Sequence, residues 1–485
     1  MKWAGGRAAA PVVLWLALAL APTPSGLAPR AWTYFALFAA VILGLILEPL
    51  PGAAIGFVGV TLAGVARLVE PSPAASIAWT LSGFQDRTVW LIVGAFVLAI
   101  GYGKSGLGRR IALWLVRLLG GRTLGLGYAI ALADLALAPG TPSNTGRSVG
   151  IVFPVIRDIP ALYGSQPGPT ARRIGGYVMW TAFAATAVTS STFLTALAPN
   201  GAAVSFVKQA TGLDITWTDW LAGSWPIGLV LVALVPLLVY VLYPPEIKRS
   251  PEVPAWAAGE LRGLGPFGRQ EKRMAAVFAL AVFLWIVGSN KDIALPLLGS
   301  QFIDATGVVL LAVALMLVTR LVEWDDVLGH KGAWNVLVWF ATLLALADGL
   351  NRVGFVSWAA KGFASALVGL SPFAVMTLLV AFFFLSHYLF ASLTAHAAAV
   401  LPVVLATGAA VPGLPLKAFA LLLCYSLGLM GVVSPYATGP APVYYASGFV
   451  SRRAFWLLGL VFGMIYLVAL LAIGVPYLTA SKPLG

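Results

Sequence analysis

The sequence has little charge and almost no cysteine. Of its 485 residues, only 10% are Asp, Glu, Lys or Arg, whereas a soluble domain carries about 25%. The single cysteine, Cys424, excludes an intrachain disulfide and argues against a thiolate metal cluster. Hydrophobic residues make up 60% of the chain. These values exclude a soluble enzyme, a disordered chain and a coiled coil, and they predict an all-α polytopic membrane protein.

Acidic residues are scarcer than basic ones, so the formal net charge is +13. In a soluble chain this would suggest nucleic acid, but in a membrane protein it indicates basic cytoplasmic loops, and no nucleic-acid partner is predicted. Neither a nucleotide-binding loop nor a catalytic triad stands out. The three histidines are far apart along the chain. We therefore expect no metal site and no cofactor, and we expect that the chain is not an enzyme.

Stretches of about 20 apolar residues are long enough to cross a bilayer. Eleven transmembrane helices are predicted, over residues 11–21, 32–50, 52–70, 88–104, 174–196, 224–243, 274–290, 305–322, 334–350, 416–434 and 454–477. The first of these stretches is short. Because Lys2 and Arg7 precede it, a signal peptide is the alternative.

Two further apolar stretches are interrupted by polar residues and do not fit single spans. The first, residues 124–138, stops at PGTPSNTG (139–146), and a second apolar stretch follows. The other, residues 373–391, stops at Ser392-Leu393-Thr394, and again an apolar stretch follows. Each is predicted as a re-entrant hairpin of two half-length helices. Such a hairpin requires a tip that is buried in protein or lines a cavity.

The distribution of Lys and Arg predicts the orientation. With eleven spans and two re-entrant hairpins, 20 of the 30 basic residues fall on the side of the N-terminus, and Arg147 lies at the first tip. The nine on the other side are Arg30, Arg67, Arg87, Lys208, Lys291, Arg352, Lys361, Lys417 and Lys482. Because basic loops stay in the cytoplasm, the N-terminus is predicted inside and the C-terminus outside.

The two halves of the chain repeat one pattern around the two tips. SNTGR (143–147) and SLTAH (392–396) both read hydroxyl, any residue, Thr, small, basic. Gly106 precedes the first Ser by 37 residues and Gly354 precedes the second by 38. Since the hairpins open on opposite sides, the repeat is inverted. Inverted repeats are typical of secondary transporters, whose substrate lies near the midplane between the repeats.

The order of these segments predicts the domain organisation. Two amphipathic stretches occupy matched positions and are predicted as interfacial helices, with ordinary surface helices as the alternative. The predicted division is a scaffold in 1–104 and 274–352, a cytoplasmic interfacial arm in 105–122, a transport domain in 123–243 and 372–485, a cytoplasmic loop in 244–273 and an outer interfacial arm in 353–371.

The polar side chains at the tips suit carboxylate oxygens. A broken helix leaves N–H groups unpaired at a half-helix N-terminus, and these groups attract anions. The substrate-binding residues predicted from the tips are Ser143, Asn144, Thr145, Ser392 and Thr394. Helix capping at a turn is the alternative role for these side chains.

Arg147 and His396 each follow the Ser of their tip by four positions. An Arg at membrane depth is costly unless it is paired, so both residues are predicted to supply fixed positive charge in place of a sodium ion. The alternatives are a structural salt bridge between Arg147 and Asp134, and a neutral core His396. For Asp134 and Asp348, proton coupling is the alternative. The favoured interpretation makes them partners of Arg147, Arg352 or a backbone amide.

Several motifs resemble those of a known family. They are TPSNTGRSVGIVFPV (141–155), TALAPN (195–200), LYPPEIK (242–248), SLTAHAAAVLP (392–402) and ATGPAPVYYASG (437–448). They resemble the divalent-anion/sodium symporter (DASS) family, and more narrowly its exchanger branch of citrate/succinate, tartrate/succinate and 2-oxoglutarate/malate translocators.

The resemblance implies eleven spans, two re-entrant hairpins, a homodimer, and an elevator motion of a transport domain against a scaffold. It also implies that Pro199, Thr438, Gly439 and Pro440 help to hold the substrate. In sodium-coupled members both tips read Ser-Asn-Thr, whereas Leu393 stands at the second Asn position here. Basic residues after both tips resemble the exchangers.

The predicted function is sodium-independent exchange of di- or tricarboxylates across the bacterial inner membrane. An empty, positively charged site is costly to move through the apolar barrier, so only the loaded carrier would cross. A sodium- or proton-coupled symporter of dicarboxylate or sulfate is the alternative. The sequence does not name the carboxylate, and the partners it predicts are carboxylate anions, the lipid bilayer and a second copy of the chain.

Overall fold

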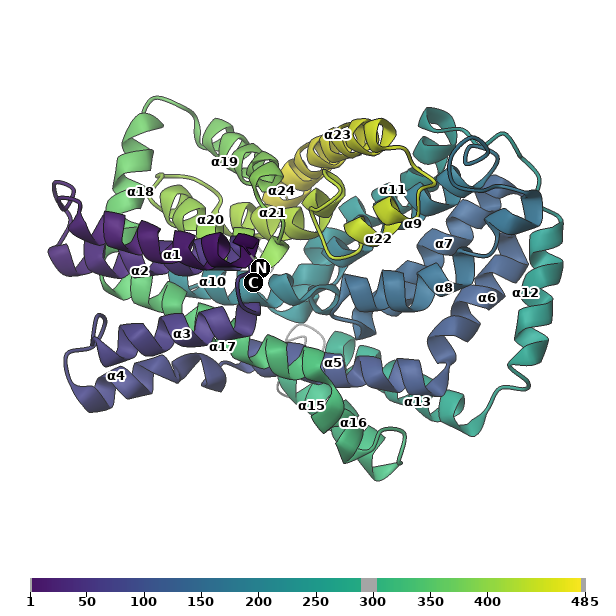
Figure 1. Cartoon of the computed structure of the whole chain (residues 1–485), viewed down its shortest axis with the longest axis horizontal. Helices are drawn as coiled ribbons and strands as arrows, with labels where there is room; N and C mark the ends of the chain where they lie inside the picture. Colours follow the sequence, from purple (N-terminus) through teal and green to yellow (C-terminus); the bar gives the residue numbers. More distant parts are fainter. Residues whose placement is uncertain (1, 289–302, 481–485) are drawn as a thin grey trace. The chain divides into compact units, whose positions relative to one another are not determined.

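The computed structural model describes residues 2–288 and 303–480, and every regular element in this part is a helix (Figure 1). The chain forms two compact units, each built from three segments. Unit 1 comprises Met1–Val93, Gly201–Ile215 and Lys331–Cys424, and unit 2 comprises Gly94–Asn200, Thr216–His330 and Tyr425–Gly485. The predicted scaffold and transport domains are defined by their relative motion. The division into two compact units does not test such motion, so the predicted domains stay a prediction.

Seven helices of the described residues are long and apolar enough to cross a membrane. They cover Pro29–Leu47, Arg87–Ser105, Thr123–Gly140, Trp217–Leu242, Lys331–Arg352, Pro372–Leu389 and Arg452–Ala480. Five of them coincide with predicted spans, and Thr123–Gly140 and Pro372–Leu389 are the first arms of the two predicted hairpins. The all-helical polytopic membrane protein is thereby confirmed, while the count of eleven spans stays a prediction.

The other predicted spans also fall on helices. Shorter apolar helices cover Arg7–Leu20, Gly52–Val65, Ala305–Val318 and Leu416–Val432. The predicted span 174–196 corresponds to α9 (Gly175–Thr192), and 274–290 corresponds to α13 (Arg269–Phe283) with a π-helical turn over Leu284–Gly288. Residues 289–290, together with Lys291 and Lys482 of the charge count, lie outside the described residues.

Unit 1 is held together by close helix packing. Its main helices are α1 (Lys2–Leu20), α2 (Pro29–Leu47), α3 (Gly52–Val65), α17 (Lys331–Arg352), α18 (Phe355–Ala366), α19 (Pro372–Ser386) and α20 (Leu393–Ala409). α17 packs on α3 and α2 (Figure 1). A Cβ at Gly56 of α3 would lie 2.3 Å from Oγ1 of Thr342, so the close approach to α17 requires glycine there.

Asp348 near the end of α17 has the partner that the sequence favoured. Its Oδ2 lies 2.6 Å from Nε of Arg352, whose Nη1 lies 2.9 Å from Oε1 of Glu70. An arginine between two carboxylates stabilises both of them electrostatically. Asp348 is therefore an ion-pair partner, as the favoured interpretation held.

Unit 2 is organised around α9. Its main helices are α6 (Leu107–Leu119), α7 (Thr123–Leu137), α9, α11 (Trp217–Leu242), α12 (Glu252–Gly263), α13, α15 (Ala305–Val318), α22 (Ala441–Ala446) and α23 (Arg452–Ala469). All 18 residues of α9 are buried, and the helix packs on both α7 and α11 (Figure 1). A Cβ at Gly127 of α7 would lie 2.0 Å from the hydroxyl of Tyr177, so α7 also approaches α9 closely.

The two predicted interfacial arms are helices that begin in the same way. α6 follows Gly106, whose φ is +77°, and α18 follows Gly354, whose φ is +88°. Glycine adopts this left-handed conformation without the steric cost of a Cβ. The matched glycines of the repeat therefore turn the chain into matched helices. Their position at the membrane surface stays a prediction.

Candidate functional site

The first hairpin breaks at its polar tip. α7 ends at Leu137, a single 3₁₀ turn covers Ala138–Gly140, and helical structure resumes as a π-helical stretch over Thr145–Val152. Pro139 and Pro142 lack the backbone N–H that a continuous helix needs, so the break follows from the sequence. The polar residues Ser143 and Asn144 lie within it.

The two tips have the same local geometry. Oγ of Ser143 accepts a hydrogen bond from the Gly146 amide at 3.0 Å, and Oγ of Ser392 accepts one from the Ala395 amide at 3.3 Å. The amide of the basic residue in turn donates to the carbonyl of the Ser, at 2.9 Å for Arg147 and 3.0 Å for His396. The capping role that was the alternative is therefore present at both tips.

Burial along the tips also repeats. The first and third residues of each tip are half-buried, the second is buried, and the basic residue is completely buried. Asn144 occupies the second position in one tip and Leu393 in the other. Four hydroxyl side chains therefore remain accessible for a ligand, two at each tip: Ser143, Thr145, Ser392 and Thr394.

A second turn of unit 2 packs directly on the Ser143 tip. Nδ2 of Asn144 donates to Oγ1 of Thr438 at 2.7 Å. A Cβ at Gly439 would lie 2.1 Å from Oγ1 of Thr145, so any larger residue there would push the turn away. Pro440 follows, buried, at the start of α22. The structure thus brings together two predicted substrate-binding segments: the tip, and the turn that contains Thr438 and Gly439.

The turn that contains Pro199 joins the same region. Oγ1 of Thr195 donates to the carbonyl of Pro139 in the broken part of the hairpin at 2.6 Å. Nδ2 of Asn200 donates to the carbonyls of Ser190 and Phe193, which end α9. Pro199 lies buried within the first turn of α10 (Ala198–Thr211). Ser392, Thr394 and His396 belong to unit 1 and are described with that unit below.

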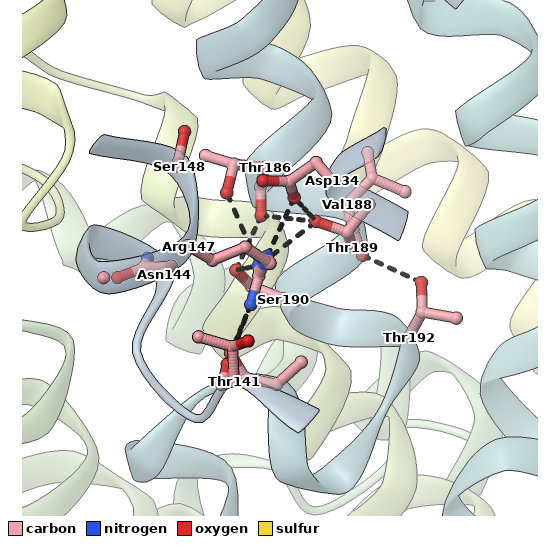
Figure 2. A network of polar contacts seen from close by, with 12 residues as sticks. Asp134, Thr141, Asn144, Arg147, Ser148, Thr186, Val188, Thr189, Ser190 and Thr192 are labelled. Atoms are coloured by element: carbon pink, nitrogen blue, oxygen red, sulfur yellow. Dashed lines mark hydrogen bonds and ion pairs between the residues drawn. The ribbon is translucent and has the colours of Figure 1, made fainter. Parts of the chain in front are cut away.

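Arg147 lies at the centre of a buried polar cluster (Figure 2). Each of its three guanidinium nitrogens donates hydrogen bonds, and the bonds are 2.9–3.4 Å long. The acceptors are Oδ2 of Asp134, the carbonyls of Thr141 and Ala196, and the hydroxyls of Thr186, Thr189 and Ser190. The guanidinium is therefore saturated by protein groups, and its donors are already occupied.

Asp134 on α7 balances this charge. Its Oδ2 lies 3.0 Å from Nε of Arg147 and also accepts a hydrogen bond from the Thr189 hydroxyl. Both side chains are almost completely buried, with 0% of Arg147 and 2% of Asp134 exposed. The salt bridge that the sequence offered as the alternative is therefore present. A buried pair of this kind is strongly destabilised when one partner is removed alone.

Sequence reasoning missed the hydroxyl residues of α9 that complete the cluster. Thr186, Thr189 and Ser190 are spaced i, i+3 and i+4, so their side chains lie on one face of the helix and point to Arg147 (Figure 2). Their spacing on an otherwise apolar segment indicated a polar face on this helix. The sequence did not indicate that Arg147 is the partner of this face, because α9 follows the tip by about 40 residues.

His396 in unit 1 has very different surroundings. Its Nε2 lies 3.0 Å from Oγ of Ser386, and its Nδ1 lies 3.1 Å from Nδ1 of His387. Its ring is stacked on Phe383 and Phe390, both with centroids 4.6 Å away. One of the two Nδ1 atoms has to be an acceptor in this bond. At least one of the two imidazoles is therefore neutral while the bond persists.

Helices broken at polar tips, in a fold of long apolar helices, are typical of a secondary transporter. The family model described as "Sodium:sulfate symporter transmembrane region" matches residues 4–480. The chain belongs to this family, the divalent-anion/sodium symporter family, and is accordingly a transporter and not an enzyme.

The chain is also similar to two curated relatives and to one solved structure. The chain is 45% identical over 482 residues to the citrate/succinate antiporter of Escherichia coli K12, covering 97% of both proteins. It is 44% identical over 481 residues to the L-tartrate/succinate antiporter of the same strain, covering 96% of both. The crystal structure of the YdaH transporter of Alcanivorax borkumensis has the same fold, with a TM-score of 0.60 and 15% identity, covering 90% of this chain and 100% of that one.

Proposed function

We propose that the protein exchanges di- or tricarboxylates across the bacterial inner membrane without sodium. The observation that carries the proposal is the saturated Arg147 guanidinium behind the Ser143 tip, because it supplies positive charge without a bound cation. The names of the two curated relatives point to citrate, tartrate and succinate as substrates.

In this proposal the accessible tip groups bind the carboxylates. Ser143, Thr145, Ser392 and Thr394 offer hydroxyl donors, and the first amides of the helices after the tips add the positive end of a helix dipole. Asn144 and Thr438 bond to each other and align the tip with the second turn. Pro199, Gly439 and Pro440 shape the wall, and Gly439 does so because only glycine fits against Thr145.

Arg147 and His396 are proposed to supply fixed positive charge in place of sodium. For Arg147 the charge is permanent, but Asp134 balances most of it at long range. What remains at the tip is a local dipole whose positive end is the guanidinium. For His396 the charge is conditional, because the bonded pair with His387 carries at most one added proton.

Obligatory exchange follows from the cost of an empty tip. Hydroxyl and amide groups without a ligand lose their hydration when they cross an apolar barrier, and each uncompensated group costs about 1–3 kcal/mol. A bound carboxylate satisfies several of these groups at once, so the loaded carrier crosses more readily. The same proposal includes an elevator motion and a homodimer. It also includes eleven spans with two re-entrant hairpins in an inverted repeat, and a cytoplasmic N-terminus with an external C-terminus.

A sodium- or proton-coupled symporter of dicarboxylate or sulfate is the second candidate. The description of the matched family favours it, because that description names sodium and sulfate. Exchange and symport would use the same tips. The two mechanisms differ in their dependence on a sodium or proton gradient, which transport assays measure.

The test is counterflow in proteoliposomes that contain the purified full chain. Uptake of labelled succinate should require internal succinate or citrate and should be unchanged when external sodium is replaced by choline. Uptake that depends on a sodium gradient and proceeds into empty vesicles would refute exchange and support the symporter. Competition by citrate, tartrate, malate, 2-oxoglutarate and sulfate in the same assay would identify the substrate class.

A further inference from the structure

A short connection in unit 2 gathers five basic residues that the transport proposal does not use. The segment after α11, residues 244–250, runs between two other parts of the chain and is fixed to both by backbone hydrogen bonds. On one side the Ser250 amide donates to the Gly121 carbonyl at 3.1 Å, and the Thr123 amide donates to the Lys248 carbonyl at 3.1 Å. On the other side the Glu246 and Ile247 amides donate to the carbonyls of Arg172 and Arg173, both at 2.9 Å.

This arrangement places the basic residues next to one another. We call the set Arg122, Arg172, Arg173, Lys248 and Arg249 the basic strap. An antiparallel bridge pairs Arg122 with Arg249, and Lys248 precedes that pair directly. Arg172 is half-buried and the other four are exposed. Because backbone bonds hold the segments, the cluster is a built feature and not a chance meeting of mobile side chains.

The charge of the basic strap is not balanced by neighbouring acids. Within residues 2–288 and 303–480 none of the five forms an ion pair with Asp or Glu, although Arg109 and Arg110 of α6 do. The one acidic residue inside the segment is Glu246, which is exposed. Five positive charges without a paired carboxylate favour an anionic ligand.

The position of the basic strap indicates which anion. It follows directly after α11, one of the helices long enough to cross the membrane. Two aromatic rings at the end of α11 support its cations, with Arg172 lying 4.0 Å from the ring centroid of Tyr243 and Lys248 lying 4.2 Å from that of Tyr240. Tyr residues at a helix end are typical of the level of lipid headgroups.

An apolar stripe is also exposed on α11, the helix that ends at the basic strap. Val230, Leu234, Leu237 and Val241 recur at intervals of four, three and four residues, so they share one face of the helix. Their side chains are exposed by 37–64%. A long helix that has exposed apolar side chains and ends at a cluster of cations suits a phospholipid, whose acyl chains would lie along α11 and whose phosphate would meet the basic strap.

We propose that the basic strap and the exposed stripe of α11 form a binding site for one anionic phospholipid. The guanidinium and ammonium groups bind the headgroup phosphate by charge-assisted hydrogen bonds. The rings of Tyr240 and Tyr243 hold two of the cations in place from the protein side. The site shares no residue with either tip and does not depend on the proposed exchange.

The test compares two double variants of the full chain, K248Q/R249Q and R452Q/R453Q. Arg452 and Arg453 are also adjacent, exposed and at the end of a long apolar helix, but no such strap holds them. Both variants remove two positive charges at the membrane surface. Since the strap is fixed through its backbone, K248Q/R249Q is expected to fold, and R122Q/R173Q provides an independent second variant.

Binding of phosphatidylglycerol and of phosphatidylcholine to delipidated, detergent-solubilised protein is measured by native mass spectrometry. K248Q/R249Q should bind phosphatidylglycerol about 30-fold more weakly, which corresponds to about 1 kcal/mol for each lost charge at 1.4 kcal/mol per tenfold change. R452Q/R453Q should change the affinity for phosphatidylglycerol by less than about threefold. The binding of phosphatidylcholine should be unchanged in both variants.

Three results would overturn the proposal. Equal losses in the two double variants would mean that only diffuse surface charge acts. Displacement of phosphatidylglycerol by millimolar inorganic phosphate would identify a free-phosphate site. Loss of a dimer in K248Q/R249Q would show that a second copy of the chain covers this face.

Discussion

At the Ser143 tip a guanidinium is surrounded by a carboxylate and three hydroxyls, whereas at the Ser392 tip an imidazole is stacked between aromatic rings. The two tips nevertheless share two hydrogen bonds, one from a backbone amide to the serine Oγ and one from the amide of the basic residue to the serine carbonyl. The same pair of hydrogen bonds is therefore followed by a paired arginine in one unit and by a histidine in aromatic surroundings in the other. The difference between the tips lies in the basic residue, Arg147 or His396, and in the side chains around it.

The comparison separates two ways to place a positive charge at membrane depth. A guanidinium at membrane depth needs a counter-charge, which Asp134 supplies to Arg147. His396 avoids the cost by sharing one hydrogen with His387 and packing in an apolar setting. A carrier with one tip of each kind would have one binding half whose electrostatics are constant and one that responds to protonation.

The largest effect is expected from R147A. It leaves Asp134 buried and unpaired, so the free energy of unfolding should fall by about 3–5 kcal/mol and exchange should be lost. The double variant D134N/R147Q removes both charges and should recover most of the lost stability while remaining inactive. Thermal unfolding in detergent and counterflow in proteoliposomes measure the two properties separately. Substantial exchange by the double variant would reduce the pair to a structural role.

A smaller effect is expected from H396N at the other tip. The variant loses the bond to His387 and the stacked ring, which should lower stability by about 2 kcal/mol. If the histidine pair holds the conditional charge, the exchange rate of the unmodified protein should change between pH 6 and 8 and that of H396N should be flatter. Counterflow at matched internal and external pH measures this. Parallel pH profiles of the two proteins would remove His396 from the proposed charge set.

The matched serines offer a more even comparison. S143A and S392A each remove one cap and should each cost about 1 kcal/mol of stability. If both hydroxyls also bind carboxylate, the KM for succinate should rise in both variants by similar factors. A rise in S143A with an unchanged KM in S392A would show that substrate binding is confined to the Ser143 tip.

The smallest effect is expected from an exposed ion pair that serves as the control for Arg147 and Asp134. Asp214, outside the spanning helices, lies 2.5 Å from Arg87 with both side chains about half-exposed. Burial raises the pKa of Asp214, but hydrogen bonding and attraction from Arg87 and Lys208 outweigh it and lower the pKa below its usual value. D214N should therefore cost less than about 1 kcal/mol.

The sign of the pH dependence follows from that shift. A carboxylate whose pKa is lower in the folded state stabilises the protein above its unfolded pKa of about 3.9 and loses that contribution as the pH falls through the folded value. Between pH 5 and 8 the stability difference between D214N and the unmodified protein should stay constant. A difference that disappears already at pH 6 would contradict this account.

Much of the candidate site could be predicted from the sequence because it depends on local patterns. The prolines at 139 and 142 predict the broken helix, and the five-residue repeat predicts two tips whose backbones match in the structure. The matched glycines Gly106 and Gly354 both adopt the left-handed conformation ahead of a helix. Such features require only residue type and spacing along one stretch of chain.

Other parts of the site depend on contacts between distant segments. The sequence left the partner of Arg147 open between substrate and Asp134, and packing of α7 and α9 against the tip decided for Asp134. His387 and His396 lie on either side of the tip, so no helical spacing suggested a pair, yet the hairpin brings their Nδ1 atoms to 3.1 Å. Which side chain meets a buried charge depends on how the helices pack.

By itself the sequence determined a polytopic helical membrane protein, its family, and two polar tips of the same backbone design. Composition, helix-breaking residues and motif spacing are properties of short stretches, and they survive in any arrangement of those stretches. Only the tertiary structure decided that Asp134 and the α9 hydroxyls saturate Arg147, that His396 shares a hydrogen with His387, and that five scattered cations form the basic strap. A buried charge is stabilised by whichever groups packing brings within hydrogen-bonding distance, and some of these groups, such as the α9 hydroxyls, come from remote parts of the chain.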